Sequence, residues 1–286
     1  MTASLTDILT MEELDKNLFR SLHHRENFRN ILFGGQVLAQ ALISAYKTVN
    51  NMPPHSLHAY FLRAGSADAP VIYDVENVRD GTSFKSRRVV ARQFGRPIFN
   101  MAVSFHQKEE GYEHQKPLPL NVDSPEKILE KRGITSGRNV DAHIPASKSK
   151  TSGEESPFQL LAVEDDVFFS TDIHPPEALY WIKSTEPLPD DPIYHYCSLA
   201  FASDFGLLAT ALLPHKTNLF DDKMVAASVD HAMWFHTEEF RVDKWLLCQT
   251  QSPWAGNARG LTHGNIFNDT GKLIASTAQE GLIRPI

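Results

Sequence analysis

The chain has 286 residues, of which 42% are hydrophobic and 22% charged, and its formal net charge at pH 7 is -7. At roughly 150 residues per domain this length corresponds to about two domains. The composition excludes a disordered or fibrous protein. The negative charge argues against a nucleic-acid-binding surface, and no apolar run approaches the roughly 20 residues that span a bilayer.

The first residues, 1–16, are acidic and contain no apolar core, so no signal peptide is expected. The 2 cysteines, Cys197 and Cys248, lie in neither a CxxC motif nor a histidine cluster. Neither a disulfide framework nor a cysteine-rich zinc site is therefore expected, and the cytoplasm is the expected compartment.

The first half of the chain predicts one helix followed by strands. The helix follows Gly34-Gly35 and runs to Tyr46, with apolar residues at the helical spacing of Leu38, Ala41, Leu42, Ala45 and Tyr46. Two strands are expected, at residues 56–61 and 71–75, and then a long hairpin. Its arms are residues 84–94 and 98–106, joined at Gly95-Arg96-Pro97, and its second arm alternates with a period of two.

The middle of the chain predicts a linker. Residues 109–157 are rich in Lys, Glu, Ser and Pro and show little periodicity, with a short helix expected around 126–132. Residues 158–178 are either an extra strand or an interface segment of the second half.

The second half predicts the same order of elements. A helix is expected after Ser203-Asp204, on Phe205, Leu208, Ala209, Leu212 and Leu213, and Pro214 ends it. Strands follow at 227–235 and 245–248, and then a hairpin over 258–282 that turns at 268–271. A repeat of this length indicates duplicated domains. Because each apolar helix must be buried against its own sheet, we expect two such units that pair through their sheets.

Eight ordered blocks carry a resemblance to a known family. They are FGGQVLAQAL (33–42), HSLHAYFLRAG (55–65), PVIYDVENVRDGTSFKSRRVVARQ (70–93), GRPIFNMAVSFHQ (95–107), FASD (201–204), DHAMWFH (230–236), GNARG (256–260) and ASTAQEGLIR (275–284). The chain resembles the acyl-CoA thioesterase II family of double hot-dog proteins. The resemblance implies an α+β fold with two tandem antiparallel sheets, each wrapped around a central helix.

On this resemblance we expect an N-terminal hot-dog domain at 1–115, a linker at 116–157 and a C-terminal hot-dog domain with the catalytic residues at 158–286. The implied activity is hydrolysis of fatty acyl-CoA thioesters to free fatty acid and CoA by an activated water. Two alternatives remain: a non-catalytic acyl-CoA-binding module, and a hot-dog hydratase or dehydratase.

The resemblance implies three catalytic residues, Asp204, Ser228 and Gln279, which together hold and activate a water. Asp204 is the ionisable member and hence the expected general base, and Ser228 stands where the family more commonly has Thr. Asp204 is expected at a helix N-terminus, whose dipole favours a carboxylate. The first half has Gly34-Gly35 at the matching place, so one active site per chain is expected, and these glycines would let backbone approach a ligand closely.

Each of these residues also has a plainer interpretation. Asp204 by itself is typical of a helix N-cap, and Gln279 of an ordinary polar strand residue. The segment from Ser228 to His231 contains the residue types of a catalytic triad. On a regular strand, however, Ser228 and Asp230 point to one face and His231 to the other, so Asp230 and His231 are expected to stabilise the strand or line the interface between the halves.

Four arginines, Arg63, Arg87, Arg88 and Arg259, are candidates to bind CoA phosphates, with solvated surface charge as the alternative for each. The histidines, among them His55, His58, His236 and His263, show no metal-ligand spacing. No metal and no cofactor is expected. The expected partner is the acyl-CoA substrate, with no nucleic acid and no membrane span, and the family resemblance implies a homodimer or a higher homo-oligomer.

Overall fold

The computed structural model describes residues 1–286 except 1–2, 26, 28–30, 135–137, 140–155 and 165–166. The first half contains α1 (Leu5–Ile8), β1 (Met11–Asp15), β2 (Leu18–Ser21), α2 (Gly34–Tyr46), β3 (Pro54–Phe61), β4 (Ile72–Asp80), β5 (Phe84–Gln93) and β6 (Arg96–His106). The connecting region contains α3 (Pro125–Arg132) and β7 (Arg138–Asn139). The second half contains β8 (Phe158–Ala162), β9 (Glu177–Ser184), α4 (Pro192–Ser203), α5 (Leu207–Leu212), β10 (Met224–Ser228), β11 (Asp230–Phe235), β12 (Leu246–Gly256), β13 (Arg259–Phe267) and β14 (Leu273–Pro285).

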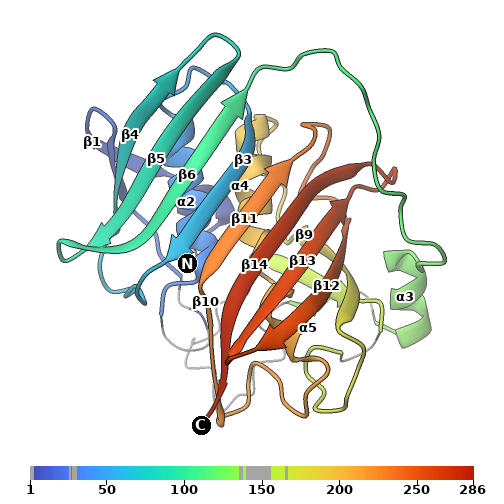
Figure 1. The fold of residues 1–286 in the computed structure, drawn as a ribbon. Coiled ribbons are helices and arrows are strands. Elements are labelled where there is room, and N and C mark those ends of the chain that lie inside the picture. Colours follow the sequence, from blue (N-terminus) through green and yellow to red (C-terminus); the bar gives the residue numbers. More distant parts are fainter. Residues whose placement is uncertain (1–2, 26, 28–30, 135–137, 140–155, 165–166) are drawn as a thin grey trace.

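The strands of the described part of the chain form one 14-stranded sheet (Figure 1). Its order is β1-β2-β4-β5-β6-β3-β11-β14-β13-β12-β9-β8-β7, with β10 paired to β14. The halves join where β3 pairs antiparallel with β11, and Leu57 lies opposite Met233 in that register. The prediction that the two halves pair through their sheets is therefore confirmed.

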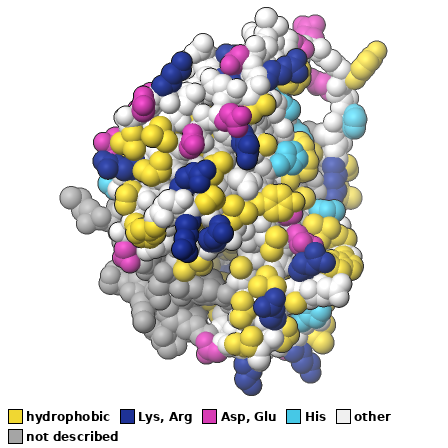
Figure 2. Space-filling view, turned by 60° about the vertical axis from the view of Figure 1, so that its left-hand side comes forward, with side chains coloured by type: hydrophobic (Ala, Val, Ile, Leu, Met, Phe, Trp, Pro, Cys, Tyr) yellow, Lys and Arg dark blue, Asp and Glu magenta, His cyan; other side chains and the backbone are white. Residues whose placement is uncertain are grey.

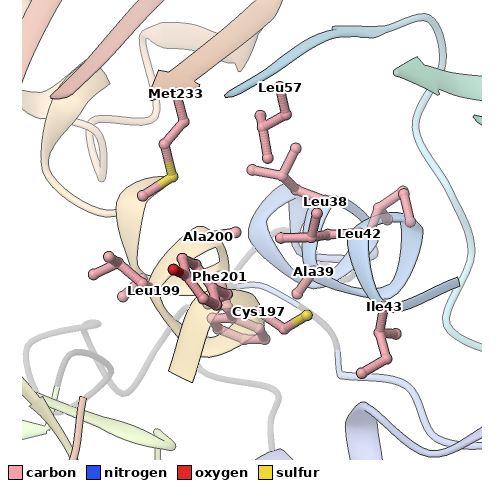
Figure 3. Packing of buried hydrophobic residues seen from close by; sticks show 14 of the residues in the cluster. Leu38, Ala39, Leu42, Ile43, Leu57, Cys197, Leu199, Ala200, Phe201 and Met233 are labelled. Carbon is pink, nitrogen blue, oxygen red and sulfur yellow. The ribbon is translucent and has the colours of Figure 1, made fainter. Parts of the chain in front are cut away.

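Helices α2, α4 and α5 lie on one side of this sheet, whereas α3 lies apart from them (Figure 1). Helix α2 packs against β4, β5 and β6 and also against α4, whereas α5 packs against β12, β13 and β14. The apolar face predicted for α2 is buried, since Leu38, Ala41 and Leu42 are fully inaccessible. Figure 3 shows Leu57 and Met233 above this helix pair. The seam between the halves is therefore part of the hydrophobic core.

The second half has two helices where the repeat predicted one. Helix α4 was missed, although Asp191 caps it through its side chain and Pro192 occupies its first turn, a common helix start. The predicted helix on residues 205–213 is the short α5, which begins at Leu207 after Gly206 at φ 81°. Asp204 is the C-cap of α4, so its interpretation as an N-cap was wrong.

The predicted strand at 227–235 is two strands, β10 and β11, separated by Val229. On their partner β14, Ser228 lies opposite Gly281 and Ala232 opposite Ala278. Between these two pairs the chain advances four residues from Ser228 to Ala232 but only three on β14, which is the signature of a β-bulge. The extra residue shifts the alternation by one position. The prediction that Ser228 and His231 point to opposite faces was therefore wrong.

The remaining predicted elements agree with the structure except at their ends. Both hairpins form, as β5–β6 and β13–β14, and the first turns at Phe94 and Gly95, both at positive φ, one residue earlier than predicted. The helix in the linker is α3, and residues 158–178 begin with an extra strand, β8. The strands β1, β2 and β9 were missed. Within the predicted linker, residues 135–137 and 140–155 lie outside the described residues.

Candidate active site

Asp204, Ser228 and Gln279 lie in contact although they come from three separate elements. Asp204 ends α4, Ser228 ends β10 and Gln279 lies in the middle of β14. The Asp204 Oδ1 atom accepts a hydrogen bond from Gln279 Nε2 at 3.0 Å and another from Ser228 Oγ at 3.2 Å. Gln279 Nε2 also donates to Ser228 Oγ at 2.5 Å. The three polar groups therefore form a closed triangle of hydrogen bonds.

The N-terminus of α2 from the first half completes this site. The backbone N–H of Gly35 interacts with the Asp204 carboxylate. It is one of the first-turn N–H groups that a helix leaves without an internal partner. The positive end of the α2 dipole thus faces the carboxylate and stabilises its negative charge. Asp204 does lie at a helix N-terminus, but at that of α2 rather than of the predicted helix after residue 204.

Only glycine fits at the start of α2. A Cβ atom on Gly34 would stand 2.7 Å from Asp204 Oδ2, and one on Gly35 would stand 2.3 Å from the carbonyl oxygen of Phe201. Both distances are far below van der Waals contact. The Gly34-Gly35 pair was expected to let backbone approach a ligand; in the structure it approaches the Asp204 carboxylate and the Phe201 carbonyl oxygen of the second half.

The surroundings of Asp204 change its acidity. Burial raises the pKa of Asp204 to about 6, and hydrogen bonds from Gln279, Ser228 and the Gly35 backbone partly oppose this rise. The residue is itself half-buried. A carboxylate with a pKa near 6 is ionised at neutral pH and is a stronger base than an ordinary aspartate.

Aromatic side chains from both halves adjoin the site and explain this desolvation. Phe33, immediately before α2, stacks on Phe205 with ring centroids 4.7 Å apart, and lies 5.0 Å from the ring of Phe201. The ring of Phe61 on β3 lies beside Gly34. The carboxylate is thus bordered by apolar rings, which favour its neutral form.

His231 belongs to the same cluster, although the sequence pattern did not predict it. Its Nδ1 lies 3.1 Å from Gln279 Oε1 and its Nε2 lies 2.9 Å from Ser203 Oγ. The bulge at Val229 places it on the face of Ser228, and no local sequence pattern announces such a bulge. Asp230 has a structural role, because its Oδ1 accepts from the backbone N–H of Glu280 at 2.7 Å.

Comparison with known proteins identifies the family. A model described as "Acyl-CoA thioesterase N-terminal domain" matches residues 24–106, and one described as "Acyl-CoA thioesterase" matches residues 163–282. Human acyl-coenzyme A thioesterase 8 is 38% identical over 98% of this chain and 88% of its own length. The chain belongs to the acyl-CoA thioesterase II family. The resemblance seen in the sequence blocks is therefore confirmed.

Solved structures of this fold agree with that assignment. The acyl-CoA thioesterase II TesB2 of Mycobacterium marinum has a TM-score of 0.78 at 36% identity, and the match covers 99% of each chain. A hot-dog protein of unknown function from Alicyclobacillus acidocaldarius has a TM-score of 0.78 at 16% identity, over 99% of this chain and 98% of its own. The second likeness concerns the fold alone, and it places this family member among hot-dog proteins.

The four arginines considered for CoA have different surroundings in this thioesterase-family chain. Arg87 is 1% exposed and its guanidinium is held by Asp80, Thr48 and backbone carbonyls, so it stabilises the first half. Arg88 pairs with Glu76 and Arg259 with Glu280, while Arg63 donates to the carbonyl of Pro97. Each of the four side chains therefore has a protein partner of its own.

Two structural absences hold for the described part of the chain. No cluster of His, Cys, Asp and Glu there has the geometry to hold a metal ion. None of its helices is long and apolar enough to cross a bilayer.

Proposed function

We propose that this protein hydrolyses acyl-CoA thioesters to a free carboxylic acid and CoA, with a water held by Asp204, Ser228 and Gln279 as the nucleophile. The observation that carries this assignment is the hydrogen-bonded triangle of carboxylate, hydroxyl and amide beside the N-terminus of α2. Relatives over nearly the full length of the chain are named acyl-CoA thioesterases, which supports the same reaction.

The proposed reaction needs only these side chains and one water. Asp204 accepts a proton from the water while the oxygen of that water attacks the thioester carbonyl carbon. Ser228 and Gln279 orient the water, since each can both donate and accept hydrogen bonds. The tetrahedral intermediate then collapses, the C–S bond breaks, and the departing sulfur of CoA takes the proton from Asp204. The carboxylate is thereby regenerated for the next turnover.

The apolar rings beside the site suit the acyl chain of the substrate. Phe33, Phe61 and Phe205 border the region of Asp204, and an acyl chain packed on them would displace water from the carboxylate. Such desolvation favours the neutral form of Asp204 and so strengthens it as a base. The fatty character of the substrate in this proposal rests on these rings.

The decisive experiment measures release of the CoA thiol from short, medium and long straight-chain acyl-CoAs. Wild type is expected to release thiol well above background. Asp204→Asn, which keeps the size of the side chain but removes its basicity, is expected to lower kcat by at least about 100-fold. Absence of thiol release by wild type on every chain length would refute the proposed activity. Full activity of Asp204→Asn would refute the site.

Hydrolysis in ¹⁸O-labelled water under single turnover tests for an acyl-enzyme on Asp204 that is hydrolysed at the aspartyl carbon. Direct attack places the label in the released acid. An acyl-aspartate intermediate that is hydrolysed at the aspartyl carbon places it in the peptide that contains Asp204 instead, so label in that peptide would contradict direct attack.

The domain division that we propose is 1–115, 116–157 and 158–286, as a double hot-dog with one active site at the junction. The two family models fall within the first and third segments. In this division α2 is the central helix of the first sheet, and α4 with α5 serves the second. Asp204, Ser228 and Gln279 all belong to the second domain, while the first contributes Gly35.

We propose further that the chain works as a homodimer or higher homo-oligomer in the cytoplasm. The buried free thiols of Cys197 and Cys248 suit a reducing compartment.

Exposed apolar side chains support the proposed assembly. Figure 2 shows hydrophobic side chains between charged ones on the face of the molecule toward β4, β5 and β6, and Tyr60 and Trp234 on the central strands are 55% and 38% exposed. Sedimentation at several concentrations tests the assembly.

A further inference from the structure

His231 is buried at the centre of the molecule and connects two parts of the site. It is 1% exposed and lies on β11, one strand away from Gln279 on β14. Its Nδ1 is 3.1 Å from Gln279 Oε1, and its Nε2 is 2.9 Å from the hydroxyl of Ser203. Hydrogen bonds thus lead from Asp204 through Gln279 and His231 to Ser203. Because Ser203 precedes Asp204 in the chain, these contacts close into a ring.

The chemistry of the Asp204 carboxylate determines which atom donates at each step of this ring. An ionised carboxylate only accepts hydrogen bonds, so the end of the Gln279 amide that faces it must be the NH₂ group. The other end is then the carbonyl oxygen, which also only accepts. The proton between His231 and Gln279 must therefore be on His231 Nδ1.

The direction of the hydrogen bond between His231 and Ser203 follows from the charge of the imidazole. Burial lowers the pKa of His231 to about 4, so at neutral pH the imidazole is uncharged and has a single N–H. With that proton on Nδ1, the Nε2 atom is an acceptor and the Ser203 hydroxyl donates to it. The same hydroxyl proton is shared with the carbonyl oxygen of Ala200, which lies 2.8 Å from Ser203 Oγ and, like His231 Nε2, only accepts.

We propose that His231 is a positioning residue whose Nδ1–H holds the Gln279 amide with its NH₂ group toward Asp204 and Ser228. An amide turned by half a rotation would present its oxygen to the carboxylate and would repel it. Without the donor at His231, the Gln279 carbonyl loses its buried partner and the amide is free to turn. This inference rests on the proposed function, because the amide is held for the water of thioester hydrolysis.

A pair of substitutions tests the donor. His231→Leu removes it, and is expected to lower kcat by about 10- to 100-fold, as for loss of a group that orients another, with KM changed by less than about threefold. His231→Asn retains an N–H near the position of Nδ1 and is expected to recover most of kcat. The assay uses the acyl-CoA that wild type hydrolyses fastest. Unchanged kcat in His231→Leu, or equal losses in both variants, would overturn the inference.

His263 provides a matched control for these variants. It lies on β13 of the same half of the sheet and its side chain is exposed, so His263→Leu is expected to keep wild-type kcat. Melting temperatures are measured for all the variants. A loss of kcat that parallels the loss of melting temperature, and that His263→Leu shares, would indicate general destabilisation and overturn the positioning role.

A double-mutant cycle separates positioning from a general structural effect. If His231 acts through Gln279, then His231→Leu lowers kcat no further in a Gln279→Ala background. A purely structural role would lower kcat by the same factor in both backgrounds, and that result would overturn the inference.

The tautomer of His231 can be measured without turnover and without a destabilising variant. Long-range ¹H–¹⁵N spectra of wild type at about pH 8, where Asp204 is ionised, are expected to show the Nδ1–H form, with the signal assigned by its absence in His231→Asn. An Nε2–H form would overturn the inference even if hydrolysis is observed. Failure of wild type to release CoA thiol refutes the proposed function instead, so the two failures are distinguishable.

Discussion

Two opposing effects of its surroundings set the pKa of the Asp204 carboxylate. Aromatic rings and burial favour its neutral form, whereas Gln279, Ser228 and the N-terminus of α2 favour the charged form. Burial has the larger effect, so the pKa of Asp204 rises to about 6. The side chain is therefore basic enough to take a proton from water and still ionised at neutral pH.

We expect the pH profile of hydrolysis to report this residue. Because the base must be ionised, kcat/KM of wild type should be constant at alkaline pH and fall about tenfold for each pH unit below a pKa near 6. Initial rates across acidic to alkaline buffers check this. A profile that stays flat through this range would contradict Asp204 as the base, and the Asp204→Asn variant should lack the inflection.

Ser228 donates to Asp204 and accepts from Gln279, so its hydroxyl has two roles in the site. We expect Ser228→Ala to lower kcat about 10- to 100-fold, the loss typical of one hydrogen bond to a charged group, and to raise the pKa of Asp204 further. Ser228→Thr keeps the hydroxyl and restricts its rotation, and should remain within about threefold of wild type. Steady-state kinetics measure kcat of both variants, and equal kcat in Ser228→Ala and Ser228→Thr would contradict a role of the hydroxyl.

At the scale of elements, the site depends on how α2 and α4 meet. The N-terminus of α2 reaches Asp204 at the C-terminus of α4 because Gly34 and Gly35 carry no Cβ atom. The bulge at Val229 then turns Ser228 and His231 to one face. Both features place groups of the site, and neither has a periodic sequence signal. The helical spacing predicted α2 well but contained no information about what its first turn contacts.

A methyl group at Gly35 should damage both packing and the site. In Gly35→Ala the new Cβ would meet the Phe201 carbonyl at 2.3 Å, so α2 and α4 must separate. We expect a loss of about 1–3 kcal/mol of unfolding free energy, as for overpacked cores, and a lower kcat because the Gly35 N–H moves from Asp204. Urea denaturation and steady-state kinetics measure the two effects.

Gly111 offers the control for this change. A Cβ atom there would meet nothing within 4 Å, so Gly111→Ala should change stability by less than about 0.5 kcal/mol. Equal behaviour of the two alanine variants would contradict the close approach of α2 to α4.

For the whole molecule, the decisive feature is the seam between β3 and β11. It makes one sheet of the two halves, and it places the α2 N-terminus of one half against the Asp204 of the other. The proposed active site is therefore complete only when both halves are docked. The duplicated order of elements predicted two paired units, and the structure adds that the pairing itself completes the site.

Leu57 allows the seam to be tested. It is fully buried and lies opposite Met233 across the two halves, so Leu57→Ala should cost about 2–5 kcal/mol. Because both halves share this core, we expect calorimetry to show one unfolding transition that moves to lower temperature without splitting. Leu120→Ala, at a residue 88% exposed, should leave the transition in place. Two separate transitions in wild type would contradict a shared core.

The sequence by itself determined the elements with a strong period and the family. Alternating apolar residues predicted both hairpins, helical spacing predicted α2, and ordered blocks pointed to Asp204, Ser228 and Gln279 as one site. Only the tertiary structure placed Gly35 on the carboxylate and His231 on the Gln279 amide. The physical reason is that periodicity records which face of an element is buried. Contacts between distant segments, and a single-residue bulge that changes the face, leave no such record.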